Sequence, residues 1–143
     1  MSRWLTQMQP WAVFFVRVVL GVAMLYHGWP KVIPGTGLRG NHFVALDHFA
    51  HYVQTLGLPR WLGYVSAFTE FLGGIFLILG FLTRFCAFLV TLNMIVAVGA
   101  VDIHHGYAGA AGSEYALALG AMAFLLLTAG SGKAALDRRL GLS

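Results

Sequence analysis

The chain has 143 residues, enough for one domain, and carries a formal net charge of +4. Hydrophobic residues make up 59% of it and charged residues only 10%, against about 45–50% and about 25% in ordinary soluble domains. This composition excludes a water-soluble domain and predicts an integral membrane protein. No basic cluster is longer than Arg138-Arg139, so we expect no nucleic-acid partner.

Four apolar stretches are long enough for membrane-spanning helices, which need about 17–25 residues. They cover residues 10–29, 61–82, 85–101 and 113–129. No small-residue cleavage pattern follows the first stretch, so we expect a retained helix rather than a signal peptide. Trp11, Trp29 and Trp61 lie at the ends of these stretches, and indole rings favour the membrane interface.

The long connection over residues 30–60 contains a further element. It begins with PKVIPGTGLRGN, which is rich in proline and glycine and predicts irregular backbone. The following HFVALDHFAHYVQTLG has apolar residues at helical spacing, which predicts a short amphipathic helix on the membrane surface or over the bundle. The predicted fold is therefore all-α: residues 1–143 form one integral membrane four-helix bundle, with this short helix between the first two spans.

The distribution of basic residues predicts the orientation. Four spans place both termini on one side of the membrane. That side carries five basic residues and the other carries three: Arg3, Arg84, Lys133, Arg138 and Arg139, against Lys31, Arg39 and Arg60. The positive-inside rule then predicts cytoplasmic termini.

Two charged residues fall inside the apolar stretches. Arg17 lies in the first and Glu70 near the middle of the second. Because a charge at this depth is costly, it normally faces protein and has a partner. Aligning the ends of the two helices puts the two residues within ~5–8 Å in depth, so we expect Arg17 to contact Glu70 directly or through water. Such a pair either fixes helix register or forms part of a ligand or proton site.

Glycines flank both charges at helical spacing. Gly21 and Gly28 share a face with Arg17, and Gly73-Gly74 follow Glu70. Small residues at such spacing allow membrane helices to approach closely. We therefore expect tight packing between the first and second spans.

Further polar residues lie toward the predicted outer side. These are His27, Lys31, Asn93, Tyr107 and Glu114, which together predict a polar cavity that opens outward. Each also has a purely structural explanation: His27 could cap its helix, Asn93 could bond between helices, and Glu114 could favour a helix N-terminus.

Metal and haem sites are less favoured. His48 and His51 are three residues apart on the amphipathic helix, a spacing that can hold a metal, but no third ligand is defined and we assign no metal. His27 with His104 or His105 could ligate haem, although nothing else in the pattern requires it.

An ordered set of motifs resembles a known family. It comprises R-x3-G-x5-H-G-x2-K at 17–31, G-L-P at 57–59, E-x2-G-G-x4-L-G-x2-T-R at 70–84, E-x2-L at 114–117 and G-S-G-K-x3-D at 130–137. The set is similar to that of the DoxX family of small four-helix membrane proteins of bacteria. In the last motif Ser131 and Ala135 stand where the family usually has proline and serine.

The resemblance implies a bacterial inner-membrane protein and two kinds of function. The family is named for its similarity to a membrane subunit of thiosulfate:quinone oxidoreductase, and other relatives resemble partners of redox enzymes or assembly factors. In the first interpretation the protein is a membrane subunit or accessory protein of a redox system and binds a quinone or similar molecule. Glu70 and His27 would exchange protons with it, Arg17 would fix the charge of Glu70, and Lys31 and Glu114 would line the entrance.

The alternative is a non-catalytic scaffold or assembly subunit of a larger membrane complex. The chain is short and has one cysteine, Cys86, so it cannot form a disulfide redox pair or a cysteine-based haem or zinc motif by itself. Both interpretations therefore predict a larger membrane or redox partner protein. A transporter is a third possibility, but no broken helix pair or internal repeat supports it.

Overall fold

The computed structural model describes residues 2–33, 42–100, 106–108 and 113–142. Their helices are α1 (Ser2–Val32), α2 (His42–Thr55), α3 (Arg60–Leu79), α4 (Thr83–Ala100), α5 (Glu114–Ala129) and α6 (Leu136–Leu140). Helices α1, α3 and α4 are long and apolar enough to span a membrane, and α5 is a shorter apolar helix of 16 residues. The predicted all-α membrane bundle with an extra helix between its first two spans is confirmed.

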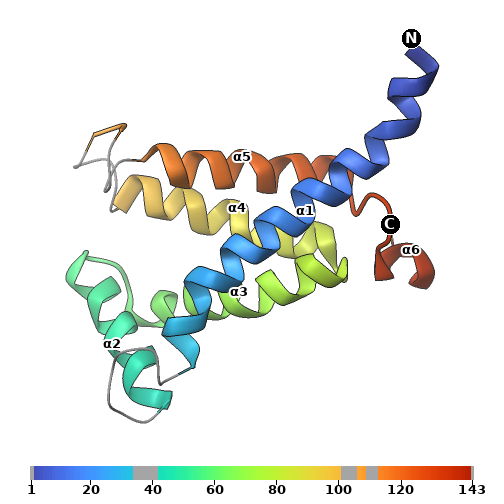
Figure 1. Cartoon of the computed structure of the whole chain (residues 1–143). Helices are drawn as coiled ribbons and strands as arrows, with labels where there is room; N and C mark the ends of the chain where they lie inside the picture. The colour runs from blue at the N-terminus through green and yellow to red at the C-terminus, as the bar shows by residue number, and fades with distance from the viewer. Residues whose placement is uncertain (1, 34–41, 101–105, 109–112, 143) are drawn as a thin grey trace.

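The four long helices pack in two pairs, α1 with α3 and α4 with α5 (Figure 1). Helix α2 packs on α3 at one end of the bundle, while both termini and α6 lie at the other end. The core between the pairs consists of apolar side chains from all four helices, among them Leu20, Met24, Leu77, Val90, Leu119 and Leu126. Large apolar residues such as Phe15, Ile95 and Phe124 are exposed, as expected where lipid surrounds the protein.

Helices α1 and α3 run antiparallel in backbone contact. A Cβ atom added to Gly28 would lie 2.4 Å from the backbone nitrogen of Phe71, and one added to Gly74 would lie 2.6 Å from that of Leu25. Gly21 is equally close, because its Cβ atom would lie 2.9 Å from the carbonyl oxygen of Gly74. The predicted tight packing is confirmed, and these contacts fix the register of α1 against α3.

Arg17 joins α1 to the segment before α6. Its guanidinium group is fully buried and donates hydrogen bonds to the backbone carbonyls of Ser131 at 2.5 Å, Ala134 at 3.0 Å and Lys133 at 3.5 Å. The group also lies 5.3 Å from the centroid of the Phe14 ring. The positive charge is thus stabilised by carbonyl dipoles from a segment more than 110 residues later in the chain.

Asp137 binds backbone N–H groups at the same end of the bundle, where Arg17 binds backbone carbonyls. Its carboxylate accepts hydrogen bonds from the backbone N–H groups of Leu82 at 2.7 Å and Thr83 at 2.8 Å, where α4 begins. The N–H group of Asp137 donates in turn to the carbonyl of Gly80 at 2.9 Å. A carboxylate at a helix N-terminus satisfies free N–H groups and interacts favourably with the helix dipole. This role accounts for the aspartate that ends the G-S-G-K-x3-D motif.

Gly28→Ala tests the backbone contact between α1 and α3. The added methyl group must push the helices apart, so we expect a loss of about 1–3 kcal/mol in the free energy of unfolding. Unfolding in mixed micelles measures it. Gly99→Ala on α4 is the matched control, because a Cβ atom there meets nothing within 4 Å and alanine is the better helix former. Equal stability of the two variants would contradict the contact.

Arg17→Lys tests the contacts with residues 131–134. One ammonium group cannot replace the fork of donors that reaches several carbonyls, so we expect a loss of about 1.5–3 kcal/mol in the free energy of unfolding. Amide hydrogen exchange of residues 131–137 should rise with it. Unchanged exchange in this segment would show that Arg17 does not hold it in place.

Candidate functional site

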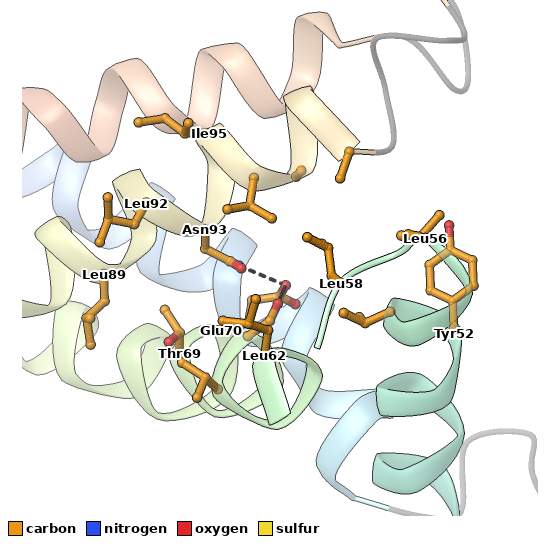
Figure 2. A pocket seen from close by; sticks show the side chains of 16 residues that line it. Tyr52, Leu56, Leu58, Leu62, Thr69, Glu70, Leu89, Leu92, Asn93 and Ile95 are labelled. Carbon is orange, nitrogen blue, oxygen red and sulfur yellow. Dashed lines mark hydrogen bonds between the residues drawn. The ribbon is translucent and has the colours of Figure 1, made fainter. Parts of the chain in front are cut away.

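A cavity of about 360 Å³ lies between α2, α3 and α4 (Figure 2). Its walls are almost entirely apolar and include Val53, Leu56, Leu58, Leu62, Val65, Leu89, Leu92, Ile95 and Val96. Glu70 from α3 and Asn93 from α4 line it as well and point toward one another in Figure 2. The cavity therefore combines an apolar body with one polar end, which is typical of small-molecule sites.

The space exists because small side chains line α3 and α4 where the helices diverge. The two helices meet at the turn over residues 80–82 and separate toward α2 (Figure 1). Ser66 and Thr69 on α3 and Ala97 and Ala100 on α4 line the cavity without filling the gap. Helix α2 and the connection after it supply the remaining wall.

Glu70 is the centre of the polar end and is only 5% exposed. Its Oε2 atom accepts a hydrogen bond from Lys31 Nζ at 2.5 Å. Its Oε1 atom accepts one from Asn93 Nδ2 at 3.1 Å and one from Ser66 Oγ at 3.4 Å. The Lys31 ammonium group also lies 4.2 Å from the centroid of the Phe49 ring on α2. Lys31 therefore connects α1 with both α2 and α3.

These groups give the polar end definite chemical capacities. The carboxylate of Glu70 can accept a proton, and the ammonium group of Lys31 can donate one. Asn93 supplies both a donor and an acceptor to anything that enters from the apolar side. A proton-exchanging pair beside an apolar chamber suits general acid–base chemistry on a hydrophobic ligand.

The predicted contact between Arg17 and Glu70 is wrong. In the antiparallel register Gly28 lies against the backbone of Glu70, and Arg17 precedes Gly28 by eleven residues, or about 16 Å along the helix. The expectation came from aligning the ends of two apolar stretches, but α1 begins at Ser2, well before the first apolar stretch. Lys31, placed at the entrance by the sequence pattern, is the partner of Glu70 instead.

The structure separates the other predicted residues from this cavity. The His27 ring contacts α5, where its Nε2 atom lies 3.1 Å from the hydroxyl of Tyr115. Tyr107 is exposed in the segment before α5, and its carbonyl accepts a hydrogen bond from the N–H group of Glu114. None of these residues lines the cavity described above. The structure thus brings together Glu70, Lys31 and Asn93, and the roles of the others stay predictions.

The histidines considered as metal or haem ligands are only partly described. Among the residues that the structure describes, no three His, Cys, Asp or Glu side chains gather closely enough to hold a metal ion. His48 and His51 lie on α2. His104 and His105, the alternative haem partners of His27, lie outside the described residues.

Asp47 on α2 anchors this helix to α3. Its carboxylate accepts hydrogen bonds from the Tyr64 hydroxyl at 2.6 Å and from the Arg60 guanidinium group. The bond from Tyr64, followed by that from Arg60, lowers the pKa of Asp47 below its usual value. These contacts, together with Phe49, hold the wall that α2 contributes to the cavity. Sequence reasoning missed this wall, although the apolar face predicted for the helix indicated burial.

Comparison with known proteins identifies the family. The DoxX family model matches residues 12–105, which include α2, α3, α4 and most of α1. The chain belongs to the DoxX family. A protein of Bacillus subtilis (strain 168) named "Putative oxidoreductase CatD" is 29% identical over 104 residues, which cover 73% of this chain and 69% of that protein. No solved structure gives a significant match. The resemblance inferred from the motifs is therefore confirmed, and the matched region contains Lys31, Glu70 and Asn93.

Lys31→Met tests the ion pair at the polar end. It leaves the carboxylate of Glu70 buried with neutral partners only, so we expect a loss of about 1–3 kcal/mol in the free energy of unfolding. The side chain of Lys31 is 23% exposed, which keeps the value below that of a fully buried pair. Adding Glu70→Gln should recover part of the loss, because no charge is then left unpaired. Additive losses in a double-mutant cycle would contradict the pairing.

Proposed function

We propose that this DoxX protein is the membrane subunit or accessory protein of a bacterial redox system and binds a quinone or similar lipid-soluble carrier. The proposal rests on the cavity of about 360 Å³, whose apolar walls end at Glu70 and Asn93. Lys31 does not line the cavity but bonds Glu70 from the side of α1. The ligand's ring would occupy the apolar chamber between α2, α3 and α4. Its oxygen atoms would face the polar end.

The chemistry of a quinone matches these residues. A quinone has an apolar ring and two carbonyl oxygens, and its reduction to a quinol takes up two electrons and two protons. The amide of Asn93, which lines the cavity, can donate a hydrogen bond to a carbonyl oxygen. Glu70 can exchange a proton with the same oxygen, and Lys31 at 2.5 Å compensates its charge.

The electrons are assigned to a partner protein. The chain has a single cysteine and so cannot form a disulfide redox pair itself. The relative from Bacillus subtilis is named as an oxidoreductase, which supports a redox setting for this chain. In this proposal the partner supplies or removes electrons, and the DoxX subunit holds the ligand and handles its protons.

The predicted orientation of the protein in the membrane and the predicted residues at the cavity entrance complete the proposal. With cytoplasmic termini in the inner membrane, the end of the bundle that carries α2 and Glu70 faces outward. His27 remains a proposed second proton-exchanging group. Tyr107 and Glu114 remain proposed entrance residues on the side of α5.

One observation favours a non-catalytic subunit as the second candidate. The first turns of α1 project beyond the rest of the bundle (Figure 1), and Trp4, Leu5 and Met8 on them are exposed. A larger membrane protein could cover these side chains, since aromatic and methionine side chains are enriched at protein interfaces. In that case the chain would act as a scaffold or assembly subunit, and the cavity would need no ligand.

Quinone binding to the purified protein in lipid nanodiscs, measured by fluorescence titration, tests the first proposal. We expect Glu70→Gln to weaken binding at least about tenfold, equivalent to about 1.4 kcal/mol, because the proton-exchanging carboxylate is lost. Arg139→Gln is the control, because it neutralises an exposed charged side chain on α6, at the opposite end of the bundle from the cavity.

The outcomes separate the two candidates. Undiminished binding to Glu70→Gln would remove Glu70 from the site. Failure of the wild-type protein to bind any quinone would overturn the proposal. A stoichiometric membrane partner recovered from native membranes, together with that failure, would favour the scaffold.

A further inference from the structure

A second cavity of about 370 Å³ lies between α3 and α4 next to the first. Its lining is almost wholly apolar and consists of Tyr64, Val65, Phe68, Thr69, Leu72, Gly73, Phe76, Phe85, Cys86 and Leu89. Val65, Thr69 and Leu89 line both cavities. The two cavities therefore adjoin along α3 and α4, and we call them together the α3–α4 groove.

The α3–α4 groove is long, and its one charged lining residue, Glu70, lies near the middle of its length on α3. On α3 its lining runs from Leu62 to Phe76, which corresponds to about 21 Å of helix. This length exceeds the ~15 Å thickness of one half of the hydrocarbon core. Glu70 and Asn93 lie in the first cavity, whereas the second cavity has no charged side chain. From the level of Glu70 the second cavity continues to Phe76, about 9 Å further along α3, and so adds apolar space for a chain attached to a polar head.

Gly73 shows why the second cavity stays open. A Cβ atom added there would have one neighbour within 4 Å, the Cγ2 atom of Val90 at 4.0 Å. Gly28 and Gly74, in contrast, are pressed against backbone atoms. Close helix packing therefore accounts for Gly28 and Gly74, while at Gly73 the missing side chain leaves space in the groove.

One side of the α3–α4 groove is formed by side chains that are exposed on the outer surface of the helix bundle. Phe68 and Leu72 on α3 and Phe85 on α4 line the second cavity and are themselves 42–58% exposed. In a bilayer these side chains meet lipid. A chain dissolved in the membrane can thus enter the groove sideways without opening the helix bundle.

We propose that the α3–α4 groove binds the isoprenoid chain of a polyprenyl quinone whose headgroup lies at Glu70 and Asn93. This inference rests on the proposed function and narrows the ligand class. The headgroup cavity supplies proton exchange, and the second cavity selects a long chain. A quinone without such a chain would fill only the first cavity.

Binding of two quinones with the same headgroup, one with a long isoprenoid chain and one with a methyl group in its place, tests the proposal. Dissociation constants are measured in nanodiscs for the wild-type protein, for Gly73→Leu and for Gly99→Leu. Gly73→Leu fills the second cavity, whereas Gly99 is an exposed helical glycine that lines neither cavity. The chain's own partition into the bilayer is the same for all three proteins and cancels in the comparison.

We expect the wild type and Gly99→Leu to prefer the long-chain quinone at least tenfold, and Gly73→Leu to lose this preference while it binds the methyl quinone normally. Normal binding of the methyl quinone also shows that Gly73→Leu is folded. If Gly73→Leu fails to fold, Gly73→Ala serves in its place, with a smaller loss of the preference expected.

Equal binding of both quinones to the wild type, or an unchanged preference in the Gly73 variants, would show that only bilayer lipid covers the groove and would overturn this inference. Failure of both quinones to bind would overturn the proposed function itself.

Discussion

The backbone contact between α1 and α3 is the constraint on which the rest of the structure depends. Gly28 and Gly74 allow the helices to approach until main-chain atoms touch, which leaves a single favourable register. That register sets Lys31 within 2.5 Å of Glu70 and carries Arg17 to the opposite end of the bundle. A shift of one helical turn, about 5.4 Å, would break both sets of contacts.

The two ends of the bundle consequently satisfy their charges in different ways. Arg17 and Asp137 are bound to backbone groups, which hold one geometry. Within the described part of the chain, Glu70 is bound to the side chains of Lys31, Asn93 and Ser66, which can change partners. One end therefore stabilises the fold, and the other can respond to a ligand. The α3–α4 groove extends from the responsive end.

The sequence predicted the elements better than their contacts. Apolar length and the spacing of polar residues gave the all-α bundle, the helix between the first two spans and the family. The predicted partner of Glu70 was wrong because the apolar stretch does not mark where α1 begins. When the ends of a helix shift, different residues face each other across the helix pair. The partners of Arg17 could not be predicted, since backbone carbonyls have no signature in side-chain patterns. The cavity between α2, α3 and α4 likewise depends on the angle between helices.

The contacts of Arg17 have a consequence for biosynthesis. An arginine near the middle of a membrane helix costs about 2.5–3.5 kcal/mol on insertion, and here its carbonyl partners are translated 114 or more residues later. At about 5–20 residues per second the ribosome needs roughly 6–23 s to reach them. During that interval the first helix must rely on lipid headgroups, water or an insertion factor to accommodate the charge. Completion of the tail then releases the helix from such help, which couples the end of translation to the final assembly of the bundle.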